Sequence, residues 1–134
     1  MRRRWPAWIL LVAFAAGCGS SPDASIKRHL LLGVAQIRTT RDRAKLHAEL
    51  VRTLAGLRRD HASTAAARRA RSLAIAGFEA TLRGVRSQLD FMENDSGNVA
   101  AATRDARRAD RYLARGAKLL RAAGAALGIR IATR

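Results

Sequence analysis

The chain has 134 residues and a net charge of +16, with 26 Lys and Arg against 10 Asp and Glu. Its single cysteine, Cys18, excludes an intrachain disulfide and a thiolate metal site. Aromatic residues make up only 4% of the chain, so we expect one small basic domain whose core is aliphatic and rich in alanine.

The first eighteen residues have the pattern of an export signal. Arg2, Arg3 and Arg4 precede an apolar run of about a dozen residues, which is too short to cross the ~30 Å hydrocarbon layer as a permanent helix. The run ends in Ala15-Ala16-Gly17-Cys18, which resembles the lipobox of bacterial lipoproteins. The resemblance implies that residues 1–17 are cleaved off and that Cys18 carries a diacylglycerol and an N-acyl chain. It places the protein on the extracytoplasmic face of a cell membrane.

Two other interpretations of this segment stay open. An ordinary secretory signal would place Cys18 near its cleavage site by chance, and an uncleaved signal anchor would retain residues 1–17.

After a short tether, residues 18–21, the sequence predicts a first long helix. Ser21-Pro22-Asp23 is typical of a helix start, with an N-cap, a proline at the first position and an acid at the positive end of the dipole. One apolar seam, with spacings of three and four residues, then continues through Ile26, Leu30, Gly33/Val34, Ile37, Thr40, Ala44, His47, Val51 and Leu54. The pattern fails at 58–62, which indicates a helix boundary.

Two further helices are predicted in chain order. The second has a seam of Ala67, Ala70, Ala74, Ile75, Phe78, Leu82, Val85, Leu89 and Met92, and it ends at the turn-forming segment 93–98. The third has a seam of Val99, Ala102, Ala106, Ala109, Leu113, Gly116, Leu120, Ala123 and Leu127, and Gly128 ends it.

These elements predict an all-α fold: an up-down-up antiparallel three-helix bundle over residues 22–128, followed by a basic tail, 129–134. The small residues in the seams predict closely packed helices with little room for a ligand. A single helix of about 70 residues from Pro22 to Met92, folded against the last helix, is the alternative; it would leave half of its apolar stripe uncovered.

The sequence contains no recognisable catalytic or metal-binding motif. His29, His47 and His61 have no acid three residues before them, and nucleophile-elbow, Walker and dinucleotide-binding patterns are absent. The oxygen-rich segment 90–98 does not match EF-hand spacing, so helix capping is its favoured role over calcium binding. We therefore predict a protein that is not an enzyme and needs no cofactor or metal.

Basic residues supply the candidate binding sites. Arg104, Arg108, Arg111, Arg115 and Lys118 recur at spacings of four and three, so they form one ridge along the last helix. A second set, near the boundary of the first two helices, comprises Arg58, Arg59, Arg68, Arg69 and Arg71. A solvated helix face is the simpler explanation of the ridge.

In the three-helix arrangement, the end near Cys18 would carry a charge of +2 and the far end +11. The basic tip would then lie too far from the anchoring bilayer to be attracted by it, because screening limits the attraction to ~8–10 Å. In a bundle lying flat, the same arginines would contact the membrane.

The resulting hypothesis is a non-enzymatic envelope lipoprotein whose basic end and ridge dock on an anionic envelope polymer or an acidic partner protein. The alternative is a structural helical spacer that self-associates or bridges envelope layers. Nucleic acid is the least favoured partner, because no aromatic residues alternate with the basic ones for base stacking.

Overall fold

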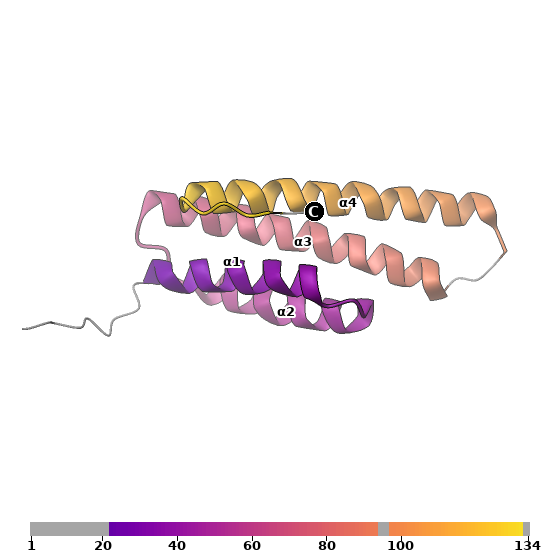
Figure 1. Ribbon diagram of the computed structural model, residues 1–134, viewed down its shortest axis with the longest axis horizontal. Helices are drawn as coiled ribbons and strands as arrows, with labels where there is room; N and C mark the ends of the chain where they lie inside the picture. The colour runs from indigo at the N-terminus through magenta and orange to yellow at the C-terminus, as the bar shows by residue number, and fades with distance from the viewer. Residues whose placement is uncertain (1–21, 94–96, 133–134) are drawn as a thin grey trace, which may run out of the picture.

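The computed structural model describes residues 22–93 and 97–132, which form four helices. The helices α1 (Pro22–Thr39) and α2 (Arg43–Arg59) form a short antiparallel pair, and α3 (Ala65–Glu93) and α4 (Val99–Ala126) form a long one (Figure 1). The described residues contain no strand, so the predicted all-helical class is confirmed.

The prediction of three helices is wrong, because the first predicted helix is two helices. The chain turns back at residues 40–42, and the Asp42 carboxylate caps α2 by accepting a hydrogen bond from the Lys45 backbone N–H at 3.0 Å. The turn also shifts the buried face of α2: Leu46 and Leu50 are buried there, whereas Val51 of the predicted seam is 46% exposed. The alternative single helix of about 70 residues is excluded for the same reason.

The core joins the two helix pairs. Ile26 and Leu30 of α1 and Leu50 of α2 are fully buried with Phe78 of α3 and Leu120 of α4. Burying each of these large side chains contributes about 1.5–3 kcal/mol relative to leaving it exposed. The long pair therefore forms one layer and the short pair the other.

Between α3 and α4 the contacts are made by small residues, as predicted. A Cβ atom at Gly84 would lie 3.2 Å from the carbonyl oxygen of Ala109, and one at Gly77 would lie 3.2 Å from the backbone nitrogen of Leu120. At these distances a methyl group would fit only if the two helices moved apart by a few tenths of an ångström. The glycines therefore set how closely the two long helices pack.

The chain after α4 is part of the bundle. Gly128 adopts a φ of +69° and reverses the chain, and the Ile129 N–H donates to the Gly124 carbonyl at 2.8 Å. Ile131 is 7% exposed and belongs to the core. Of the predicted basic tail, residues 129–132 thus pack on the bundle, and residues 133–134 lie outside the described chain.

The far part of the α3–α4 hairpin projects beyond α1 and α2 (Figure 1). Ile37, at the end of α1, and Arg43, at the start of α2, line one pocket with Thr81 of α3 and Leu113 of α4. The α1–α2 turn is therefore level with Thr81 and Leu113. We call residues 82–93 and 97–112, beyond that level, the projecting hairpin.

Candidate functional site

Five predicted arginines meet at one end of the molecule. Arg58 and Arg59 end α2, a five-residue link follows, and Arg68, Arg69 and Arg71 lie in the first two turns of α3. The short link keeps these residues close together. We call Arg58, Arg59, Arg68, Arg69 and Arg71 the basic end.

The basic end lies beside the start of α1. The Asp23 carboxylate, in the first turn of α1, accepts hydrogen bonds from the Ser63 backbone N–H and side-chain hydroxyl, both at 3.0 Å, and from the Thr64 hydroxyl at 3.1 Å. The expectation of a basic tip far from the N-terminal segment is therefore wrong. Because α1 and α2 are separate antiparallel helices, the chain returns to its starting end before α3 begins.

These arginines do not all have the same role. The Arg71 guanidinium donates to the Leu57 carbonyl at 3.0 Å and to the Arg58 carbonyl. It thus provides hydrogen-bond donors for two carbonyl groups in the last turn of α2. Arg58 forms an ion pair of 2.6 Å with Glu79. Arg71 is thus mainly structural and Arg58 is partly neutralised.

The remaining arginines of the basic end face solvent. Arg68 makes one long hydrogen bond, 3.5 Å, to the Ser63 carbonyl. Arg59 and Arg69 are exposed, and no ion pair or hydrogen bond within the described chain holds their guanidinium groups. These three side chains are available to an anionic ligand.

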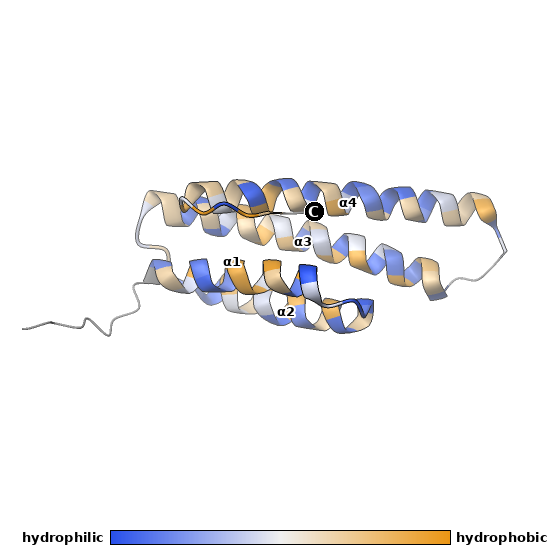
Figure 2. Ribbon diagram, in the orientation of Figure 1, coloured by the Kyte–Doolittle hydropathy of each residue, from blue (hydrophilic) through white to orange (hydrophobic). Residues whose placement is uncertain are grey.

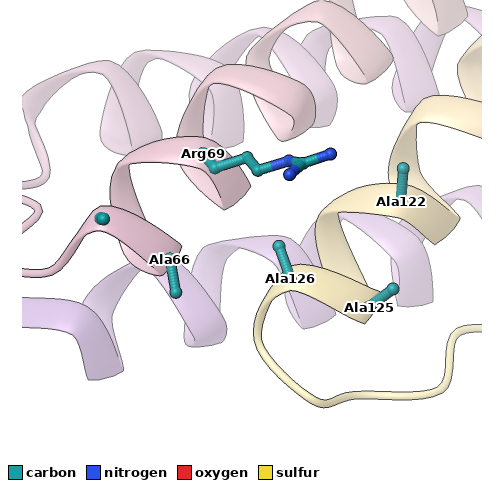
Figure 3. Close-up of a pocket in the computed structure, with 6 residues that line it drawn as sticks. Ala66, Arg69, Ala122, Ala125 and Ala126 are labelled. Atoms are coloured by element: carbon teal, nitrogen blue, oxygen red, sulfur yellow. The ribbon is translucent and has the colours of Figure 1, made fainter.

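An apolar groove adjoins them. It has a volume of about 560 Å³ and is lined by Arg69 and by five alanines: Ala65, Ala66, Ala122, Ala125 and Ala126. Figure 3 shows the Arg69 side chain extending from α3 across the gap toward α4, with Ala122 and Ala126 on the other side. The groove combines an alanine floor with a cationic edge.

The predicted ridge is present on α4. Arg104, Arg108, Arg111, Arg115 and Lys118 are all exposed, and Arg108 lies 4.0 Å from Asp105. The ridge runs along α4 from the projecting hairpin toward the basic end, so it forms a surface separate from the groove. Exposed pairs of this kind stabilise the fold by at most ~1 kcal/mol.

Sequence reasoning missed a polar cluster that ties α1 to the end of α2. Asp60, the C-cap of α2, accepts a hydrogen bond from the Ser25 hydroxyl at 2.5 Å, and its other oxygen lies 2.5 Å from His29 Nδ1. A catalytic relay would need the serine on the second ring nitrogen, but His29 Nε2 lies against Gly56. The cluster is therefore structural. The partners are 31 or more residues apart, so no local motif could have revealed them.

The same junction perturbs one ionisable group. The hydrogen bond from the Ser63 backbone N–H, aided by the Ser63 and Thr64 hydroxyls and by the charge of Arg68, holds the pKa of Asp23 below its ordinary value. The Thr64 hydroxyl also caps α3, because it accepts the Ala67 N–H at 3.0 Å. Asp23 thus links the start of α1 to the start of α3.

Other predicted sites have simple structural roles or lie outside the described residues. Asn98 caps α4 by accepting the Ala101 N–H at 3.1 Å, and Asp90 pairs with Arg86 at 3.0 Å. Residues 94–96, the signal 1–17 and the lipidation site Cys18 are not among the described residues.

Within residues 22–93 and 97–132, no three His, Asp or Glu side chains gather in a group suited to a metal ion. In that same part of the chain, no helix is both long and apolar enough to cross a bilayer. Comparison with protein-family models, curated proteins and solved structures finds no match for this chain.

Proposed function

We propose that this protein is a non-enzymatic, lipid-anchored envelope lipoprotein whose basic end binds an anionic surface next to its own anchor. That surface consists of the headgroups of the membrane that holds the Cys18 lipid. An anionic envelope polymer lying against the same headgroups offers the same chemistry.

One observation carries this proposal: the basic end and the start of α1 occupy the same end of the bundle. Cys18 precedes Pro22 by four residues, which span at most ~14 Å when extended. Electrostatic attraction to a charged bilayer acts over ~8–10 Å. A chain anchored at Cys18 would thus hold the basic end within or close to the range of that attraction.

The expected role of the arginines is orientation. Each Arg near an anionic surface contributes about 1 kcal/mol, whereas two or more acyl chains already give stable anchoring. Arg59, Arg68 and Arg69 would therefore set which end faces the membrane, with the ridge on α4 left free for an acidic partner.

The electrostatic part is tested on residues 21–134, which retain every residue of the described core. We expect this fragment to sediment with vesicles containing phosphatidylglycerol and not with neutral vesicles, and to dissociate as salt is raised. Changing Arg59, Arg68 and Arg69 to Gln should weaken binding on the order of 100-fold at low salt.

The matched control changes Arg104, Arg107 and Arg111 on α4 to Gln, which removes the same charge from exposed positions. Equal losses from the two triple variants would show a bulk charge effect and contradict the proposal. Binding of the fragment to isolated envelope but not to anionic vesicles would identify the polymer as the surface.

The anchor is tested in the full chain by Cys18→Ser. Since the thioether needs sulfur, we expect the variant to lose acyl labelling and to leave the membrane fraction. Unchanged labelling would contradict lipidation at Cys18 without affecting the vesicle result.

A further inference from the structure

The apolar seam of the projecting hairpin is buried near α1 and α2 and becomes exposed toward the far end of the hairpin. The α3 seam that contacts α1 and α2 through Phe78 continues through Val85 and Leu89 to Met92. Phe78 and Val85 are 0% exposed, whereas Met92 is 66% exposed and Val99, at the start of α4, is 77% exposed. In Figure 2 the part of the α3–α4 hairpin beyond α1 and α2 is mostly hydrophilic in colour, with separate hydrophobic segments that include the start of α4.

This end also concentrates exposed apolar side chains. Of the six large hydrophobic residues that are exposed in the described chain, Phe91, Met92 and Val99 lie here. We call these three residues the tip patch. Together they give the far end of the hairpin an apolar surface that a partner could cover.

The charge distribution indicates which partner fits. The projecting hairpin has six basic and four acidic residues, whereas the rest of the described chain has sixteen basic and five acidic. Two copies of so basic a chain repel each other over most of their surface. They approach with least repulsion where both signs are present.

The order of charges along α3 selects an orientation. Arg83 and Arg86 come first in the projecting part, and Asp90 and Glu93 follow. Within one copy Arg86 pairs with Asp90 at 3.0 Å, so Arg83 and Glu93 are the charges left for a second copy. These two are opposite each other when two α3 helices run antiparallel. Glu93 is exposed at the negative end of the α3 dipole, and the last turn of α3 has no basic residue. An arginine from a second copy would offset the unfavourable placement of the Glu93 charge at the negative end of the dipole.

Steric fit selects the same orientation. The α1–α2 pair covers this side of the hairpin up to the level of Thr81 and Leu113. Two copies pointing the same way would bring their α1–α2 layers into collision before the projecting hairpins met. When the copies point in opposite directions, each projecting hairpin occupies the space beyond the other's α1–α2 turn.

From these observations we infer that the projecting hairpin binds a second copy of this chain. The two hairpins overlap head to head along about 18–21 Å and form a two-fold, four-helix contact. This inference does not rest on lipidation or on membrane binding.

The test is cysteine cross-linking in the full chain, in isolated membranes, with a short bismaleimide. Ala106 is exposed midway along the projecting part of α4, near the two-fold axis of the overlap, so Ala106→Cys should give a product of twice the chain mass. Ala114→Cys is the matched control on the same helix, exposed but nearer the basic end, and should give none. The chain with Cys18 alone reports whether that thiol reacts. A Cys18→Ser background removes its contribution and is cross-linked in whichever fraction, membrane or soluble, contains the variant.

A second comparison tests the tip patch. Phe91→Ser with Met92→Ser should reduce the Ala106→Cys product on the order of tenfold or more. Leu31→Ser with Leu32→Ser removes two similarly exposed apolar side chains from α1 and should leave it unchanged. Circular dichroism checks that both pairs retain the helices.

Equal products from Ala106→Cys and Ala114→Cys would show random collision and overturn the inference. Absence of product at Ala106 would overturn it, and so would a product with the mass of another protein. Because the cross-link forms with or without Cys18, its failure is distinguishable from failure of the lipoprotein proposal.

Discussion

Gly116→Ala provides a direct test of the contact between the two long helices. A Cβ atom at Gly116 would clash with Thr81 Oγ1 and lie 2.9 Å from the Gly77 carbonyl oxygen and 3.1 Å from the Thr81 backbone nitrogen. Because two of these are backbone atoms of α3, the clash is relieved only if the helices separate. Overpacking of this kind costs about 1–3 kcal/mol.

Helix propensity acts in the opposite direction. Alanine is more favourable than glycine in a helix interior by about 0.8–1 kcal/mol. We therefore expect a net loss of up to about 2 kcal/mol, which lowers the Tm of a domain this size by up to roughly 10 °C. Thermal unfolding of residues 21–134, followed by circular dichroism, measures the difference.

Ala114→Gly supplies the control on the same helix. Ala114 is exposed, so this change should cost only the propensity difference of about 1 kcal/mol. Two opposite substitutions, two residues apart, should thus both destabilise. A Gly116→Ala variant more stable than the parent would refute the close contact between α3 and α4.

Two further predictions concern the core and the junction at the start of α1. Phe78→Ala should cost about 3–5 kcal/mol in urea unfolding, since its ring is fully buried against Gly33; the same change at Phe91, 44% exposed, should cost far less. The lowered pKa of Asp23 means that its contribution to stability is present above the unfolded-state pKa of about 3.9 and is lost as pH falls through the lower folded-state value. Thermal unfolding below pH 4 should therefore show a weaker pH dependence in Asp23→Asn than in the parent, and identical pH profiles would contradict this role.

The α3–α4 hairpin could be predicted from the sequence because its seams and its turn signals agree. Most predicted seam positions of both helices are buried or half-buried, whereas Met92, Val99 and Ala106 in the projecting hairpin are exposed. The predicted boundary at 58–62 overlaps the α2–α3 link, and the chain reverses at Gly128 as expected. In α3 and α4 the regular spacing of apolar residues stops where each helix stops.

The break between α1 and α2 was not predicted because the apolar period continues across it. Ile37, Thr40, Ala44 and His47 stay in phase through a three-residue turn, so periodicity alone indicated one helix. The local signal of the break is Asp42, an N-cap residue in the middle of this period, and it was not used in predicting the helices. An N-cap residue inside a regular apolar repeat is therefore evidence of a helix boundary that the repeat itself does not show.

That single error moved the candidate site from one end of the molecule to the other. The arginines of the basic end were identified correctly as a cluster, because their closeness depends only on the short link after Arg59. Their position relative to the N-terminus depends on whether the chain has reversed once or twice before α3. The number of helices before α3, which no local pattern encodes, thus decides whether the cluster lies beside the start of α1 or at the opposite end of the molecule.

The proposed contact of the basic end with an anionic surface and the proposed contact between two projecting hairpins constrain each other. Head-to-head overlap of two projecting hairpins places the two basic ends at opposite ends of the dimer, roughly 65 Å apart for α4 helices of 28 residues each. Two anchors so placed either enter one bilayer with the dimer lying along it, or enter two facing surfaces with the dimer between them.

Vesicle aggregation distinguishes these two arrangements. A bridging dimer should aggregate phosphatidylglycerol vesicles, the Phe91→Ser, Met92→Ser variant should bind them without aggregation, and the Arg59, Arg68, Arg69 variant should do neither. Aggregation that survives loss of the tip patch would show that one copy carries two membrane-binding surfaces, and the ridge on α4 would then be the second.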